Sequence, residues 1–340
     1  MRITKFANVA LVAASLAMFG AGTASAADAD WKKSLVFGGG SLGGVYYTVA
    51  GAISDLVQQK VEGIDRVSTI TGSTTLFIPQ IQENKVDIML GTPDSMYFGW
   101  SAEAGLGFDK DERYDKLRVA GVAYINIMDL VVLKESGFGK IEDIADGRVG
   151  VLSATLKVPM ELYLKAHGIE DPQVTIIGDW NQMAQALRDG SIAAMQGIST
   201  HPTPAITELG NAVDLQLLSY SSDAAVKDFL SNPTTRFFQK AVQPAGTYDW
   251  QTEDYATIGR GTTVIVSADL PDDEVYAIVK TIYENTDALK KVHPSAADFT
   301  TAMVQEYLDA GVIQIPFHPG ARRYFEEQGV KIPDSVPAAE

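Results

Sequence analysis

Residues 34–44 read SLVFGGGSLGG, a short apolar run that passes directly into a glycine-rich turn. Leucine, valine and phenylalanine favour a strand, and the glycines end it. After the turn, Val49, Ile53, Leu56 and Val57 recur at helical spacing. A strand, a tight turn and a helix in this order begin an α/β unit, so we expect a sheet that is covered by helices.

The same alternation continues along the chain. Further apolar segments predict strands at 66–71, 87–90, 117–124, 129–133, 148–152, 173–177, 193–198 and 261–266. This order predicts an α/β fold with a mostly parallel sheet and helices on both faces. We predict two lobes joined by two strand crossings, with a ligand cleft between them. The predicted parts are 27–131 for the first lobe, 132–262 for the second, and 263–340 for the return to the first lobe and the C-terminal helices.

Residues 1–26 have the pattern of a secretory signal peptide. Arg2 and Lys5 give the positive start, 7–19 is apolar, and 24–26 reads Ala-Ser-Ala, a typical cleavage pattern. The apolar stretch is shorter than the ~20 residues that a membrane helix needs. An uncleaved anchor and a buried first helix are the alternatives. We expect cleavage after about residue 26 and export to the periplasm.

Composition excludes several classes of function. The chain has 340 residues, which is enough for about two domains. Its formal charge is −16, and it becomes −18 when the predicted signal peptide is removed. Such a charge argues against nucleic-acid binding. The absence of cysteine excludes disulfides, thiolate metal sites and a lipid anchor on an N-terminal cysteine. The four histidines are far apart and no Walker loop is present, so we expect no metal and no cofactor. We expect a monomer.

The glycine-rich turn allows three interpretations. Gly38, Gly40 and Gly43 match the dinucleotide fingerprint G-x-G-x-x-G, but the second strand lacks the acidic residue expected at its end. Residues 39–43 match the nucleophile elbow G-x-S-x-G with Ser41 as nucleophile, although a hydrolase elbow follows several strands rather than the first. The third interpretation is a backbone cradle, in which free N–H groups and a helix N-terminus hold a small anion.

The cradle is repeated at two other strand ends. Residues 71–74 read TGST after the second strand, and 153–155 read SAT in the second lobe. Three helix N-termini at one cleft would bind a small carboxylate, whereas ordinary capping is the alternative for each. These loops contain no arginine that would hold a carboxylate bidentately. Arg236 and Arg260 are the nearest candidates, and we expect surface roles for both.

Residues 316–324 read PFHPGARRY, and 87–94 read DIMLGTPD. With the glycine-rich run 38–47 and the turn 71–73, these stretches resemble the TAXI family, the extracytoplasmic solute receptors of TRAP transporters. The resemblance covers nearly all of the chain after the signal peptide. It implies a two-lobed periplasmic binding fold, similar to type II, that closes on a solute and docks on the membrane subunits of a TRAP permease. Members are associated with glutamate, glutamine and related dicarboxylates.

The strand ends and the resemblance together predict the ligand-binding residues. They are Gly40, Ser41, Gly44, Tyr47, Thr71, Gly72, Ser73, Thr92, Asp94 and Tyr124, faced by Ser153, Thr155 and Gln196 from the second lobe. We expect Tyr124 to stack over the ligand. We expect Asp94 to receive a ligand ammonium, or to cap local backbone when the ligand has none.

Two departures from the family pattern bear on the solute. Thr92 stands where the family commonly has glutamine, and 153–156 replaces a Gly-Ser-Gly-Thr run. Both places should face the cleft, so the solute can differ from the usual amino acid of the family. We therefore predict a non-enzymatic receptor for a small carboxylate-bearing solute. The alternatives are a secreted serine hydrolase that uses Ser41, and a receptor that signals to a membrane sensor.

Overall fold

The computed structural model describes residues 31–339, so the predicted signal peptide lies outside the described residues. The strands are β1 (Ser34–Gly38), β2 (Arg66–Ile70), β3 (Ile88–Gly91), β4 (Leu117–Leu133), β5 (Val149–Val151), β6 (Val174–Ile176), β7 (Ala194–Ser199), β8 (Leu215–Leu217), β9 (Phe238–Gln243) and β10 (Tyr255–Ser267).

The α-helices are α1 (Val45–Lys60), α2 (Thr74–Gln82), α3 (Pro93–Ser101), α4 (Ala154–Ala166), α5 (Trp180–Arg188), α6 (Pro204–Gly210), α7 (Asp223–Ser231), α8 (Asp272–Glu284), α9 (Thr286–Lys290), α10 (Thr301–Asp309) and α11 (Pro319–Glu327). Three 3₁₀ turns complete the structure: η1 (Lys134–Ser136), η2 (Ile141–Ile144) and η3 (Pro294–Asp298). Within residues 31–339, none of the helices has the length and apolar character that crossing a membrane requires.

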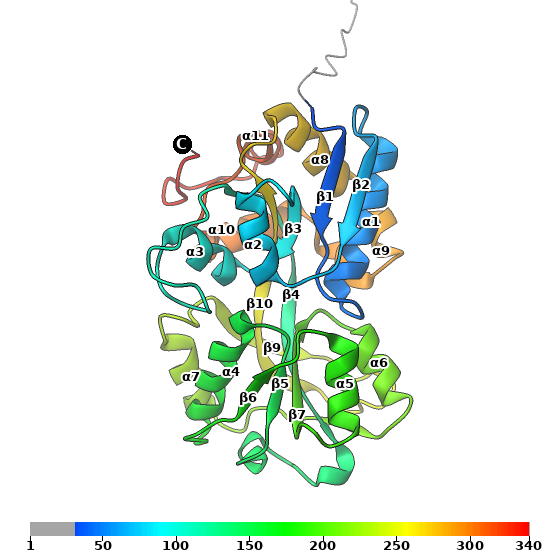
Figure 1. Cartoon of the computed structure of the whole chain (residues 1–340), viewed down its shortest axis with the longest axis vertical. Coiled ribbons are helices and arrows are strands. Elements are labelled where there is room, and N and C mark those ends of the chain that lie inside the picture. Colours follow the sequence, from blue (N-terminus) through cyan, green and yellow to red (C-terminus); the bar gives the residue numbers. More distant parts are fainter. Residues whose placement is uncertain (1–30, 340) are drawn as a thin grey trace, which may run out of the picture.

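All ten strands belong to one sheet with the order β2-β1-β3-β10-β4-β7-β5-β6, while β8 pairs with β4 and β9 with β10. The pairs within β1–β3 and within β5–β7 are parallel, and β4 and β10 run antiparallel to their neighbours. The long strands β4 and β10 pass from the upper to the lower half of the molecule (Figure 1). The mixed α/β fold agrees with the sequence prediction, with two antiparallel strands at its centre.

The hydrophobic core is divided along these two strands. On β4, Tyr124 packs in the first core and Met128 in the second. On β10, Ile258 packs in the second core and Val264 in the first. A further cluster around Trp180 completes the lower half. Each lobe therefore has its own core. The exact boundaries that we predict, at 131 and 262, fall inside β4 and β10 and stay a prediction.

The segment 117–133 corrects the sequence analysis, which predicted two strands separated near Ile125 to Met128. It forms the single strand β4 because its pairing with β10 continues through Ile125, Asn126 and Ile127. The polar Asn126 does not interrupt the strand, since its amide donates a hydrogen bond to the Tyr46 hydroxyl, 2.9 Å away. A buried polar side chain is tolerated in a central strand when it finds such partners.

The PFHPGARRY run fixes the C-terminal helix α11 against α8. His318 donates from Nε2 to the Leu270 carbonyl at 2.9 Å and accepts at Nδ1 from the Gly320 amide at 3.2 Å. A Cβ on Gly320 would lie 2.0 Å from the Asp272 carbonyl oxygen, so glycine is required for this close approach. The stretch 316–324, which resembles the TAXI family, thus has a structural role, and none of its residues lines the cavity described below.

Glu274, at the start of α8, is buried, and Oε2 accepts from the Lys32 amide at 3.0 Å. Burial, with a smaller contribution from Asp87, raises the pKa of Glu274 from 4.5 to about 7. A carboxyl whose pKa is raised by folding stabilises the protein below pH 4.5, and this stability is lost as the pH rises through about 7.

We therefore expect Glu274→Gln to melt several degrees above the parent at pH 8 and close to it at pH 4.5. The exposed Glu62→Gln is the control. An equal shift at both pH values would contradict this explanation.

Candidate functional site

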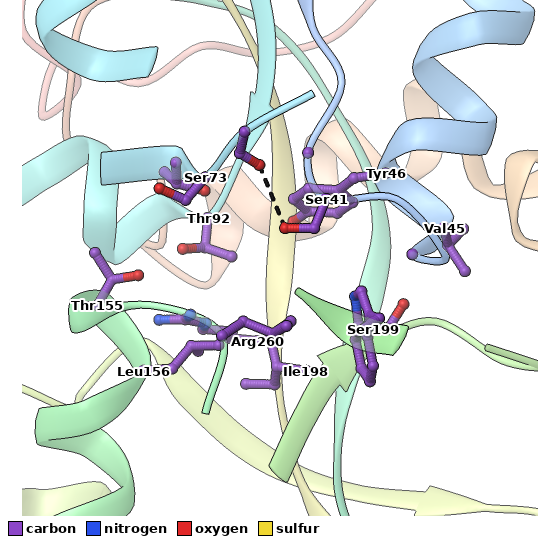
Figure 2. A pocket seen from close by; sticks show the side chains of 16 residues that line it. Ser41, Val45, Tyr46, Ser73, Thr92, Thr155, Leu156, Ile198, Ser199 and Arg260 are labelled. Carbon is purple, nitrogen blue, oxygen red and sulfur yellow. Dashed lines mark hydrogen bonds between the residues drawn. The ribbon is translucent and has the colours of Figure 1, made fainter. Parts of the chain in front are cut away.

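A cavity lies between the two lobes. Its accessible volume is about 70 Å³, room for about five water molecules. Its lining comes from both lobes and consists of Gly40, Ser41, Gly44, Val45, Tyr46, Gly72, Ser73, Thr74, Thr92, Leu152, Thr155, Leu156, Trp180, Ile198, Ser199 and Arg260. Figure 2 shows Ser73 and Thr92 above the cavity and Thr155, Leu156 and Arg260 below it. The lining is therefore a ring of hydroxyl groups and apolar side chains with one guanidinium.

Several helices begin at this cavity, among them α1, α2 and α4. Gly44, Ser73 and Ser153 are the N-cap residues of α1, α2 and α4. Ser73 accepts from the Leu76 amide at 3.3 Å, but in α1 and α4 no side chain caps the first turn. Ser153 instead shares a 2.8 Å hydrogen bond with Thr155. The first turns of α1 and α4 therefore bring amide donors and positive dipole ends to the cavity.

Arg260 is the charged residue of the lining, and its position corrects the surface role that the sequence suggested. The side chain is only 2% exposed. Its Nη1 pairs with the Asp94 carboxylate, and its guanidinium lies 5.0 Å from the centre of the Phe238 ring. Within the described part of the chain, Nε of Arg260 has no hydrogen-bond partner. The sequence analysis predicted a surface role for Arg260 because the predicted strand began at residue 261, whereas β10 begins at Tyr255.

Arg236, the other candidate arginine, is exposed as expected. Its guanidinium lies 4.9 Å from the centre of the Tyr97 ring, and Nη1 donates to the Pro233 carbonyl at 2.7 Å. It is not among the residues that line the cavity.

Asp94 points to Arg260 and not into the cavity. It is fully buried in the first turn of α3, where Oδ1 accepts from the Ser95 amide at 2.8 Å and Oδ2 accepts from Arg260. Among residues 31–339, neither aspartate nor glutamate lines the cavity. Nor do these residues contain a group of three or more acidic and histidine side chains that could hold a metal ion. The cavity is therefore suited to an anion, in spite of the net negative charge of the chain.

The cavity brings together seven of the residues predicted from the sequence: Gly40, Ser41, Gly44, Gly72, Ser73, Thr92 and Thr155. The remaining six predicted residues are not part of its lining: Tyr47, Thr71, Asp94, Tyr124, Ser153 and Gln196.

Side-chain direction and burial explain several of these differences. Tyr124 is 1% exposed and packs in the first core between Tyr46 and Phe299, with ring centres 6.3 Å away on each side, so it does not stack over a ligand. Gln196 is buried in β7, and its amide donates to the Gly197 carbonyl at 3.4 Å. Ser153 and Thr71 flank residues that do line the cavity.

Sequence reasoning missed Tyr46, Trp180, Ser199 and Arg260 among others. Tyr46 lines the cavity in place of its neighbour Tyr47, because one residue turns a helix by about 100°. Burial raises the pKa of Tyr46 to about 12, so its hydroxyl stays protonated. Trp180 follows the N-cap Asp179 of α5. The sequence indicates where this helix begins, but it does not indicate that the helix start lies against the first lobe.

The two lobes contact each other around the cavity. Ser41 lies 3.2 Å from the Gly178 carbonyl of the second lobe and 3.4 Å from the Gly72 carbonyl of its own, so its hydroxyl donates to these oxygens. The Ala205 amide donates to the Gly43 carbonyl at 3.3 Å. These contacts close the cleft over the cavity.

The geometry of Ser41 does not assemble a hydrolase triad. A nucleophilic serine needs a histidine within hydrogen-bond reach. Within the described residues, the histidine hydrogen bonds go to other partners: His167 to Tyr163, His201 to Tyr248, His293 to Ser295 and Pro202, and His318 to Leu270 and Gly320.

Gly44 offers a test of lobe closure. A Cβ added there would lie 2.6 Å from Nε1 of Trp180, a buried side chain of the opposite lobe. We expect Gly44→Ala to hold the lobes apart and to weaken ligand binding more than tenfold, with the free energy of unfolding little changed. Titration calorimetry and the radius of gyration from small-angle scattering measure both effects. Gly51→Ala in the same helix is the control, since a Cβ there has no neighbour within 4 Å. Equal affinities of the two variants would contradict closure at Gly44.

Two lobes with separate cores, joined by two long strands around a buried cavity, define a solute-binding protein of the periplasmic type. The chain belongs to the NMT1-like family, whose model matches residues 37–329.

Solved structures share the fold at low sequence identity. MatC of Rhodopseudomonas palustris with bound malate is similar with a TM-score of 0.53 and 13% identity, over 86% of this chain and 98% of that one. A protein of Bordetella bronchiseptica RB50 is similar with a TM-score of 0.51 and 14% identity, over 88% of this chain and 98% of that one.

Proposed function

We propose that this protein is a periplasmic, non-enzymatic receptor that captures a small carboxylate-bearing solute and delivers it to a TRAP-type permease. The observation that carries the proposal is Arg260, a buried arginine of the cavity lining whose Nε has no hydrogen-bond partner among the described residues. A guanidinium has five N–H donors in a fixed fork, which matches the two oxygens of a carboxylate. Asp94 occupies Nη1, and we propose that the other edge of the fork holds the carboxylate of the ligand.

The remaining lining supports the same ligand chemistry. Ser73, Thr92 and Thr155 bring hydroxyl groups to the cavity, and α1 and α4 bring uncapped N-termini. Donors and dipoles in a cavity shielded from water act more strongly on a charge than they do in solution. A carboxylate would therefore meet the guanidinium of Arg260, whose charge Asp94 partly offsets, and several fixed partial charges.

Closure of the cleft between the lobes links solute binding to delivery of the solute to the permease. Ligand contacts from both lobes are made only when the cleft is closed, so binding favours the closed form. The predicted export signal in 1–26 and the resemblance of 38–47 and 316–324 to TAXI receptors support a TRAP permease as the partner that binds this form. Absence of a permease gene beside the gene for this protein would favour a membrane sensor instead.

Thermal-shift measurements with amino acids, 2-oxo acids, 2-hydroxy acids and dicarboxylates, malate included, test the ligand class. A ligand at 100 times its Kd stabilises the folded state by about 2.7 kcal/mol, which raises the melting temperature by several degrees. We expect such a rise with at least one carboxylate and none with sugars or amines. No rise with any carboxylate would overturn the proposal. Ester hydrolysis that Ser41→Ala abolishes would identify a hydrolase.

A further inference from the structure

The charges around the cavity also bear on which carboxylates the site accepts, an inference that rests on the proposed function. We infer that the solute is an organic acid without an ammonium group, such as a 2-oxo acid, a 2-hydroxy acid or a dicarboxylate, and that the site rejects amino acids. The cavity has a positive group for a carboxylate in Arg260 but, within residues 31–339, no lining carboxylate for an ammonium.

Neither of the two fully buried aspartates beside the lobe junction lines the cavity, although the carboxylate oxygens of Asp129 have no hydrogen-bond partner within residues 31–339. Asp94 accepts from Arg260 and from the Ser95 amide, so it holds the arginine in place and does not face the ligand. Asp129 of β4 is turned to His201, with Oδ1 of the aspartate 3.3 Å from Nε2 of the histidine. It does not line the cavity.

Several hydroxyl groups near the cavity already pair with one another. Hydroxyl pairs join Ser73 to Thr75 at 3.0 Å, Thr92 to Ser95 at 3.0 Å and Thr155 to Ser153 at 2.8 Å. The carbonyls of Gly72 and Gly178 face the Ser41 hydroxyl. An ammonium carries a full positive charge, and burying it without a facing carboxylate is strongly unfavourable. The positive ends of α1 and α4 add repulsion.

A ligand with an oxygen in place of the ammonium avoids both the unfavourable burial and the repulsion. A 2-oxo or 2-hydroxy oxygen accepts hydrogen bonds, which the amide groups of the uncapped helix turns supply. The accessible volume of about 70 Å³ favours a small acid. Arg260 and the helix N-termini thus select for negative charge, while the absence of a facing carboxylate selects against a positive one.

Matched pairs of ligands test this inference by titration calorimetry on the parent protein. Pyruvate and alanine, 2-oxoglutarate and glutamate, and malate and aspartate each share a carbon skeleton and carboxylate number, and differ at carbon 2. We expect the acid to bind at least 100-fold more tightly than its amino acid in the pair that binds best. An amino acid that binds as tightly as its acid, or more tightly, would overturn the inference and leave the proposed carboxylate receptor intact. No binding of any member would overturn the proposed function, and the inference with it.

Discussion

Arg260→Gln is expected to weaken the binding of the best organic acid by 100-fold or more in titration calorimetry. The guanidinium is buried at the cavity, and its Nε has no hydrogen-bond partner within residues 31–339. Truncating one partner of a buried, hydrogen-bonded charge pair costs about 2–5 kcal/mol, which corresponds to roughly 30-fold to several thousand-fold in Kd. Glutamine keeps part of the side-chain volume but has no charge.

Two controls separate ligand binding from folding. Arg236→Gln removes the exposed arginine that lies over Tyr97, and we expect parental affinity. The double variant Asp94→Asn with Arg260→Gln removes both charges, so no unpaired charge is left in the core. We expect this variant to fold and still to bind no acid. Parental affinity in the double variant would show that Arg260 is not the anion-binding group.

Asp94→Asn is expected to destabilise the ligand-free protein by about 3–5 kcal/mol, because it leaves the buried Arg260 without its counter-charge. For a chain of this size, 1 kcal/mol corresponds to about 2–4 °C in melting temperature or somewhat less. A bound carboxylate supplies the missing negative charge. The rise in melting temperature on adding the acid should therefore be larger in Asp94→Asn than in the parent.

Asp223→Asn is the matched control for this variant. Asp223 also lies in the first turn of a helix and pairs with a cation, Lys240 at 2.5 Å, but its side chain is 79% exposed. Exposed ion pairs contribute about 0–1 kcal/mol, so we expect a small change and the parental ligand shift. A parental melting temperature for Asp94→Asn would contradict the role assigned to the buried pair, and so would a smaller ligand shift.

Local signals explain how much of the fold could be predicted. Helix α5 (Trp180–Arg188) has clear local signals in the sequence, because Asp179 caps its first turn and Asp189 and Gly190 follow its last residue. The glycine-rich turn and the turn at 71–74 were placed at the cavity because strand ends of a parallel sheet meet at one edge.

What could not be predicted depends on contacts between distant residues. The pairing of Asp94 with Arg260 joins residues 166 positions apart and leaves no local pattern. The sequence alone placed Arg260 outside a strand and on the surface, because arginine is rarely buried without a partner. In the same way, the continuity of β4 depends on β10, whose residues follow more than a hundred positions later.

A crystal structure of the protein with its tightest-binding organic acid tests the central claim most directly. The account predicts the acid between the lobes, with a carboxylate oxygen within hydrogen-bond distance of Nε of Arg260 and Asp94 still paired with the same arginine. An acid bound outside this cavity would contradict the account, and so would one whose carboxylate lies away from Arg260.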